Sequence, residues 1–285
     1  MNFKKVQIFS VAVAASLILG SAAFCDETAD TGRALVAKWQ NAVIGIKVVA
    51  KMSMSYGGKD STQEQKNEAV GCVIDASGLV VTTLKETDPS SIIEEMPGGQ
   101  GEKLSVSAEI TDVKYVMADG KEIAAKVILR DKDLDLAFLR PVKKLDAPMT
   151  SLDLSKTAKP TLFDQIIILS RQGAVGNRAI SVSLDRISSI LEKPRTLYIP
   201  DGYGDFGNPT FAMDGNLIGI MVMKQLPKGS SSASGWKDTM AQVIMPAADI
   251  AEVAKQAPAT ADAVKDTPAI PASSKPVTST PKPSK

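Results

Sequence analysis

Residues 71–85 read Gly-Cys-Val-Ile-Asp-Ala-Ser-Gly-Leu-Val-Val-Thr-Thr-Leu-Lys, and they contain two short apolar runs separated by a turn sequence. The runs, at 70–74 and 79–83, are rich in Val and Ile, which suit the half-buried surface of a β-sheet. Between them, Asp75-Ala-Ser-Gly78 supplies residues that tight turns favour. This part of the chain therefore predicts two β-strands joined by a tight turn.

The same pattern recurs through the middle of the chain. Short stretches rich in Val and Ile, many of them alternating in period two, occur at 43–49, 123–129, 134–139, 165–169, 179–187, 217–223 and 242–245. Turn sequences at 118–120 and 213–216 separate some of them. Many short strands without long helical stretches between them predict an all-β sandwich or barrel and argue against a parallel α/β sheet.

Two short helices and two loops complete this prediction. Residues 31–41 and 246–256 each place their apolar side chains on one helical face, and the second segment begins with a proline suited to the first helical position. Residues 55–68 and 88–102 are polar or rich in glycine. We therefore expect these two segments to be long surface loops.

The N-terminus has the order of a secretory signal peptide, which we place at residues 1–23. A short basic start precedes an uncharged apolar run from Val6 to Leu19, and Ser21 and Ala23 suit the positions before a cleavage site. An uncleaved membrane anchor would use the same residues, but the run is shorter than the roughly 20 residues that a bilayer requires. We expect export to the periplasm or the extracellular space, without a membrane anchor after cleavage.

The composition limits which disulfide, metal and nucleic-acid sites the chain can form. The chain has two cysteines, Cys25 and Cys72, no histidine, and a formal net charge of +1. A Cys25–Cys72 bridge and a lipid on Cys25 are both left open, since two cysteines make no disulfide framework. Asp131, Asp133 and Asp135 resemble the start of a calcium-binding loop but lack its later glycine and glutamate. We expect no metal, no cofactor and, because no basic cluster is interleaved with aromatic residues, no nucleic-acid partner.

One glycine-rich segment invites two interpretations that its context rejects. Residues 202–207 match the GxGxxG pattern and contain an Asp-Phe-Gly triplet. A dinucleotide site needs that pattern to open a helix, whereas Asn208-Pro209 follows here. The kinase interpretation fails because no catalytic-loop pattern precedes the triplet.

Three stretches of the chain, taken in their order along the sequence, carry a resemblance to a known family. Residues 71–85 come first, and residues 118–139 follow, beginning Ala-Asp-Gly and ending Asp-Leu-Asp-Leu-Ala-Phe-Leu. Residues 204–220 then read Gly-Asp-Phe-Gly-Asn-Pro-Thr-Phe-Ala-Met-Asp-Gly-Asn-Leu-Ile-Gly-Ile. Together with residues 241–246 and the helix after them, they resemble the trypsin-like serine proteases of the HtrA/Deg type. The resemblance implies two packed antiparallel Greek-key β-barrels with a short C-terminal helix, in a degenerate form without the PDZ domain usual in that family.

This resemblance assigns the segments of the chain. After the signal peptide, residues 24–40 form an N-terminal segment with a helix. Residues 41–256 form the double barrel, divided into 41–150 and 151–256. Residues 257–285 consist largely of Ala, Pro, Thr, Ser and Lys, a composition that predicts a disordered tail.

The resemblance also locates the positions of the catalytic triad. Lys85 stands where the family has its histidine, Asp135 where it has the orienting aspartate, and Phe206 where it has the nucleophilic serine. Gly204, Asp205, Phe206 and Gly207 form the former oxyanion loop. The Gly204 and Phe206 amides leave a partial oxyanion hole as an alternative, although we expect Asn208 and the bulky Phe206 to occlude it. Because the family reaction needs both serine and histidine, and losing either costs on the order of 10⁶-fold in turnover, we expect no catalytic residues here. Lys85 and Asp135 are expected to form an ion pair.

Two functions follow as hypotheses. In the first, the protein is an exported, inactive protease homologue that holds an unidentified protein or peptide in the cell envelope, with residues 217–223 as an exposed strand that accepts an extended peptide. In the second, it is a hydrolase of the same family with a non-standard nucleophile. Cys72 is the residue to test, although a free cysteine is more often a small buried apolar residue.

Overall fold

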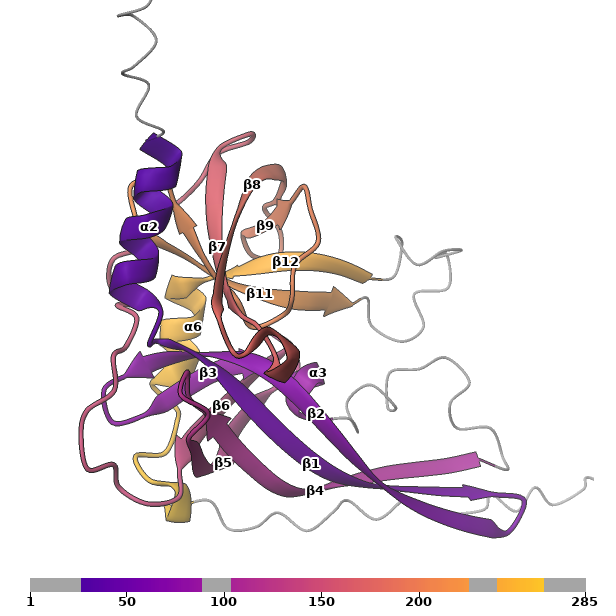
Figure 1. The fold of residues 1–285 in the computed structure, drawn as a ribbon. Coiled ribbons are helices and arrows are strands. Elements are labelled where there is room, and N and C mark those ends of the chain that lie inside the picture. Colours follow the sequence, from indigo (N-terminus) through magenta and orange to yellow (C-terminus); the bar gives the residue numbers. More distant parts are fainter. Residues whose placement is uncertain (1–26, 89–103, 226–239, 264–285) are drawn as a thin grey trace, which may run out of the picture.

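The computed structural model describes residues 27–88, 104–225 and 240–263, and these residues form two closed antiparallel barrels of six strands each (Figure 1). The first barrel contains β1 (Val43–Tyr56), β2 (Lys59–Asp75), β3 (Leu79–Thr83), β4 (Leu104–Val116), β5 (Glu122–Asp131) and β6 (Leu136–Pro141). The second contains β7 (Gln165–Arg171), β8 (Ile180–Leu191), β9 (Leu197–Pro200), β10 (Pro209–Ala212), β11 (Leu217–Gln225) and β12 (Met240–Pro246). The predicted all-β double barrel is confirmed.

Both barrels have the same strand order. In the first it is β1-β2-β3-β6-β5-β4, and in the second β7-β8-β9-β12-β11-β10. Each barrel closes by pairing its first strand with its fourth, so that neither barrel leaves a long open sheet inside the fold. This repeated topology places the two barrels against each other across a shared apolar contact.

The helices lie at the ends of the barrels. α2 (Glu27–Trp39) begins earlier than predicted and α6 (Ala247–Ala254) follows Pro246, which caps it instead of forming its first turn. A four-residue helix, α3 (Leu84–Thr87), and two 3₁₀ turns, η1 (Ala174–Gly176) and η2 (Ala261–Ala263), were not predicted. None of the helices in the described residues is both long and apolar enough to cross a membrane.

Three buried apolar clusters hold this arrangement together. One fills the first barrel around Ile46 and Tyr115, and a second fills the second barrel around Ile166 and Ile218. The third lies between the barrels and draws on both of them and on the flanking helices. Its members include Leu35, Cys72, Phe138, Ile167, Phe211, Met245, Ile250 and Ala261. The contact between the barrels is therefore a hydrophobic core in its own right.

A buried arginine adds polar contacts to this junction. Arg171 at the end of β7 donates hydrogen bonds to the backbone carbonyls of Val43, at 2.5 Å, Arg178, at 2.7 Å, and Gln40. Burial lowers its pKa from the ordinary value of arginine. One side chain of the second barrel thus fixes the entry of the chain into the first.

The folded chain continues beyond the predicted boundary at residue 256. Arg140 of β6 donates a hydrogen bond from Nε to the carbonyl of Pro258 at 2.7 Å, and Ala261 is 2% exposed. Residues 257–263 therefore pack on the first barrel, and their small side chains suit this close contact. The rest of the predicted tail, residues 264–285, lies outside the described residues, as do the predicted signal peptide and Cys25.

The prediction of a surface loop at residues 55–68 was wrong. β1 and β2 stay paired along their whole length to Tyr56 and Lys59, and the Gly57–Gly58 turn between them has φ values of 57° and 80°. Two glycines with positive φ form the type of turn that closes a long hairpin. Figure 1 shows this hairpin leaving the barrel together with β4, which pairs with β1 and had not been predicted. Residues 89–102 of the other expected loop lie outside the described residues.

Candidate functional site

Asp135 connects the two barrels. It lies in the turn before β6 and is 4% exposed. Its Oδ1 atom accepts a hydrogen bond from the backbone N–H of Lys85 at 3.0 Å, and its backbone carbonyl accepts one from Leu84 at 3.0 Å. Its Oδ2 atom accepts a hydrogen bond from the backbone N–H of Met223 in β11 at 3.1 Å. Because Met223 belongs to the second barrel, this buried carboxylate holds the barrels together.

Lys85 lies directly beside this carboxylate, as the resemblance implied. It is half-buried in α3, which begins after Thr83, whose hydroxyl accepts the N–H of Glu86. The contact that joins Lys85 to Asp135 runs through the lysine backbone. The expected ion pair between the two side chains stays a prediction. A double-mutant cycle on Lys85→Met and Asp135→Asn measures it, and a coupling free energy of zero would contradict it.

The oxyanion loop is held in a different way. Gly204 donates its backbone N–H to Oε1 of Gln242 at 3.0 Å, and Nε2 of Gln242 donates back to the carbonyl of Gly204. The N–H that would stabilise an oxyanion therefore already has an acceptor, so the partial oxyanion hole expected from Gly204 and Phe206 lacks one of its two donors. Sequence reasoning missed Gln242, whose signal was a single amide at the start of an apolar strand.

Gly207 brings this loop against the first barrel. It donates its N–H to the carbonyl of Met221 at 2.8 Å, and its own carbonyl accepts a hydrogen bond from Cys72 Sγ at 3.2 Å. Its φ is 81°, and a Cβ atom added to it would lie 2.1 Å from the carbonyl oxygen of Val70 in β2. Only glycine fits this position. Phe206, half-buried and directly before Gly207, is thereby held close to the first barrel.

Cys72 is a free thiol with 0% exposure. Burial raises its pKa well above the ordinary value of cysteine. Its hydrogen bond to Gly207 engages the protonated form of the sulfur, whereas a nucleophile must be a thiolate that the substrate can reach. Both the burial and the raised pKa argue against Cys72 as a nucleophile.

The remaining residues of the loop are structural. Asp205 is exposed and accepts a hydrogen bond from Ser170 Oγ at 3.4 Å. Asn208 is buried, and its carbonyl accepts the N–H of Met221 at 2.9 Å. Pro209, the next residue, begins β10. The Asn208 Oδ1 and Thr210 Oγ1 atoms are buried without a hydrogen-bond partner among the described residues.

The expectation that residues 217–223 form an exposed strand was largely wrong. β11 pairs with β10 as far as Ile220 and with β12 along its whole length. Met221 then exchanges hydrogen bonds with Gly207 and Asn208, and the N–H of Met223 is bound by Asp135. In the described part of the chain, the segment of β11 that pairs on one side only is shorter and comes later, at Lys224 and Gln225, which pair with β12.

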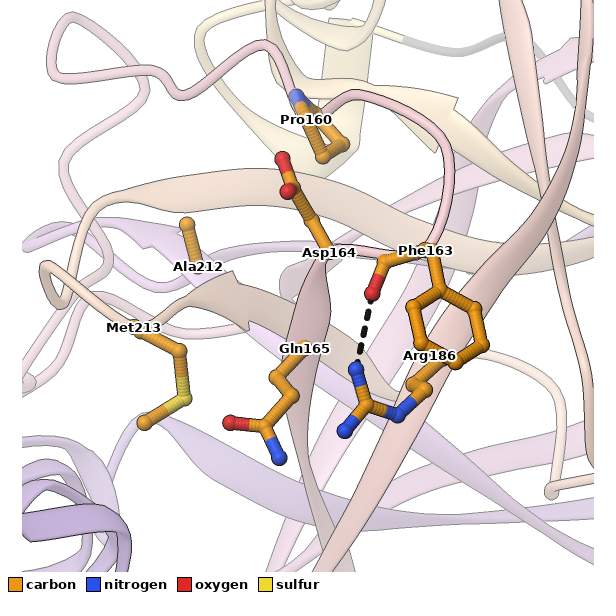
Figure 2. A pocket seen from close by; sticks show the side chains of 7 residues that line it. All are labelled: Pro160, Phe163, Asp164, Gln165, Arg186, Ala212 and Met213. Atoms are coloured by element: carbon orange, nitrogen blue, oxygen red, sulfur yellow. Dashed lines mark hydrogen bonds between the residues drawn. The ribbon is translucent and has the colours of Figure 1, made fainter.

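A shallow cavity of about 380 Å³ lies at the opposite end of the second barrel (Figure 2). Its lining comprises Pro160, Phe163, Asp164, Gln165, Arg186, Ala212 and Met213. Arg186 donates to the carbonyl of Phe163 at 2.9 Å and stacks on its ring, and Asp164 accepts the N–H and hydroxyl of Thr161. β7 runs from Gln165 at this cavity to Ser170 beside Asp205, so the cavity does not belong to the junction site.

Comparison with known families identifies the chain. A family model described as a trypsin-like peptidase domain matches residues 69–220, from β2 to β11, and this range includes Lys85, Asp135 and Phe206. No curated protein matches the chain. Since the match covers more than half of the 285 residues and the fold is a double barrel, the chain belongs to the family of trypsin-like peptidase domains.

Proposed function

We propose that this protein is a catalytically inactive trypsin-like homologue that is exported and binds a protein or peptide in the cell envelope. One observation carries the proposal: Lys85 and Phe206 occupy the positions of the base and the nucleophile, and the chain contains no histidine. Phenylalanine offers no hydroxyl to attack a carbonyl. The family mechanism needs a histidine at the position of Lys85 to take the proton of the serine, and this chain has none.

The surroundings of these residues support the same conclusion. Gln242 occupies the N–H of Gly204, and Cys72, the nucleophile of the alternative hypothesis, is buried with a raised pKa. Nucleophile, base and one oxyanion donor are thus each replaced or engaged elsewhere. What remains of the site is its scaffold.

The end of β11 supports peptide binding. Met221 uses its N–H and C=O on the side away from β12, and groups of one strand alternate in direction, so the N–H and C=O of Met223 and Gln225 point to that side as well. Asp135 takes the N–H of Met223. Among the described residues, the carbonyl of Met223 and the backbone of Gln225 are left to pair with an extended peptide, which would add a strand to the second barrel.

Turnover of casein by the purified full chain tests inactivity. We expect none above a blank, with an active trypsin as the positive control and Cys72→Ala as the matched variant. Turnover by the wild type that disappears in Cys72→Ala would replace the proposal with a cysteine hydrolase.

Capture from envelope extract tests binding. Gln225→Pro removes an N–H that points away from β12, a place where a sheet tolerates proline, and Gln225→Ala keeps that N–H. We expect the proline variant to lose the captured partner and the alanine variant to retain it. Equal capture by both variants would contradict binding at this edge.

A further inference from the structure

We propose that this protein forms a two-fold symmetric dimer in which the outer edge of β2, residues 59–66, pairs antiparallel with the same edge of a second copy. This inference concerns the projecting hairpin and does not depend on whether the former active site binds a peptide.

The outer edge of β2 offers unpaired backbone. β2 pairs with β1 along its whole length but with β3 only from Cys72 onward. Residues 59–66 are all exposed. Beyond them the edge is occupied, since Asn67 donates to Glu86 at 2.9 Å and Glu68 forms an ion pair with Arg178 at 3.5 Å. In the described part of the chain, the available edge therefore runs from residue 59 to residue 66.

The direction of each backbone group follows from the hairpin. A two-residue turn makes Tyr56 and Lys59 a hydrogen-bonded pair, so the odd-numbered residues of β2 face β1 and the even-numbered residues face outward. Two hydrogen bonds agree with this parity. The N–H of Val73 donates to Ala42 on the β1 side, and the carbonyl of Val70 accepts the hydroxyl of Thr82 on the other side.

The outward-facing residues are Asp60, Thr62, Glu64 and Lys66. Two copies related by a two-fold axis at Gln63 place Asp60 opposite Lys66 and Thr62 opposite Glu64, and each pair occurs twice. The neighbouring registers are repulsive: an axis at Thr62 places Asp60 opposite Glu64, and an axis at Glu64 places that residue opposite its own copy. Cross-strand charge pairs therefore select one register.

The other outer strand of the hairpin does not offer this match. Over residues 104–113, β4 carries two charged residues, Glu109 and Asp112, and both are acidic. No cation within this segment could oppose an acidic residue of a second copy, and Lys114 just beyond it already forms an ion pair with Asp112 at 3.5 Å. Pairing through β2 has a further effect, because residues directly opposite in a sheet lie on the same face. Met54 and Tyr56, 47% and 63% exposed, would then lie on one face of a continuous sheet with their copies.

Sedimentation velocity on the full chain, with exchanged charges, tests the dimer. We expect the wild type to dimerise with rising concentration, and Lys66→Glu and Asp60→Lys each to weaken the dimer by about tenfold, since each brings two like-charge pairs together. An equimolar mixture of the two variants restores both attractive pairs and should dimerise as the wild type does. Lys59→Glu changes the charge of the same edge opposite Asn67 and is the matched control, with wild-type dimerisation expected.

Three results would overturn the proposal. They are a monomeric wild type at about 100 μM, dimers of Lys66→Glu or Asp60→Lys as strong as those of the wild type, and a mixture of the two variants that stays monomeric. All three altered residues are exposed, so near-wild-type folding is expected. Thermal unfolding of each variant verifies this, and Thr62→Pro, which removes an outward N–H, gives an independent loss of the dimer.

Discussion

The resemblance aligns Asp135 and Phe206 with two catalytic positions of the family, and the surroundings of the two residues differ. The carboxylate of Asp135 is buried and bound by backbone N–H groups of Lys85 in one barrel and Met223 in the other. Phe206 lies in a loop in which the backbone N–H of Gly204 donates a hydrogen bond to the side chain of Gln242. On the aspartate side the hydrogen bonds serve to hold the barrels together. On the side of Phe206, the hydrogen bonds bind the Gly204 backbone to a side chain of the same barrel.

Gly207 completes this comparison, because it belongs to the nucleophile loop but resembles Asp135 in its role. Its Cα approaches the backbone of β2 so closely that no side chain fits. By the resemblance, Asp135 and Gly207 match the residues of the family at their positions, whereas Lys85 and Phe206 stand where the family has histidine and serine. The comparison predicts that stability depends on the first group and responds little to the second.

The largest effect is expected for Gly207→Ala. Its Cβ would collide with the carbonyl of Val70, and its φ of 81° is unfavourable for alanine, so we expect a loss of about 3–5 kcal/mol in the free energy of unfolding, measured in urea. Gly120→Ala has a similar φ of 82° with open space around it and should lose only about 1 kcal/mol. Equal losses for both variants would show that the close approach to β2 does not matter.

The second-largest loss in the free energy of unfolding is expected for Asp135→Ala. The substitution leaves two backbone N–H groups without their charged acceptor, which is expected to lower the free energy of unfolding by about 3 kcal/mol. Asp133→Ala, two residues earlier and exposed, should change it by less than about 0.5 kcal/mol. If urea unfolding gives the same value for the two variants, Asp135 does not hold the junction.

Cys72 should make the free energy of unfolding depend on pH. Its folded pKa is raised by burial, so the neutral thiol stabilises the folded state fully below the unfolded pKa of about 8.5. Above that pH the unfolded chain releases the proton, and stability falls by about 1.4 kcal/mol per pH unit. Cys72→Ala should lack this slope, apart from a constant offset for the lost side chain. Parallel curves for the two proteins between pH 8.5 and 10 would mean that the thiol is not desolvated.

Gln242→Ala should have the smallest effect. It removes two neutral hydrogen bonds to Gly204, at an expected cost of about 1–2 kcal/mol in the free energy of unfolding. The rate of hydrogen exchange at the Gly204 amide should rise in this variant. The exchange rate at the Met223 amide, which is bound by Asp135, should stay unchanged. Faster exchange at both amides would remove the distinction between the two sides of the site.

The sequence predicted the fold where strands are buried in a core. The stretch at 79–83 became β3, which is buried throughout, and the apolar residues of 165–169 became most of β7. The polar half of β2 was missed because this hairpin stands outside the barrel, where hydrogen bonds and the Gly57–Gly58 turn, rather than burial, maintain the strands. Hydrophobic periodicity carries no signal in such a place. β4 was missed as well, although Val113 and Tyr115 at its inner end are buried in the first barrel.

The candidate site, like the fold, was predicted from the sequence only in part. The resemblance placed Lys85 and Asp135 side by side, and the structure joins them. It did not foresee that Gln242 would bind Gly204, because the contact links residues far apart in the chain and depends on how one amide is buried. It also placed the peptide edge too early in β11, since the aspartate that binds Met223 lies in the other barrel.

Each end of the folded chain rests on the barrel to which it does not belong. α2 is made before the first barrel, yet Gly32 and Leu35 lie against Val182 and Gly215 of the second. Residues 257–263 are made after the second barrel and pack on the first. Neither barrel can therefore complete its packing while the ribosome still holds the other. A chain threaded unfolded through a membrane would reach its final form only after Ala261 had emerged, and both barrels should then melt in a single transition.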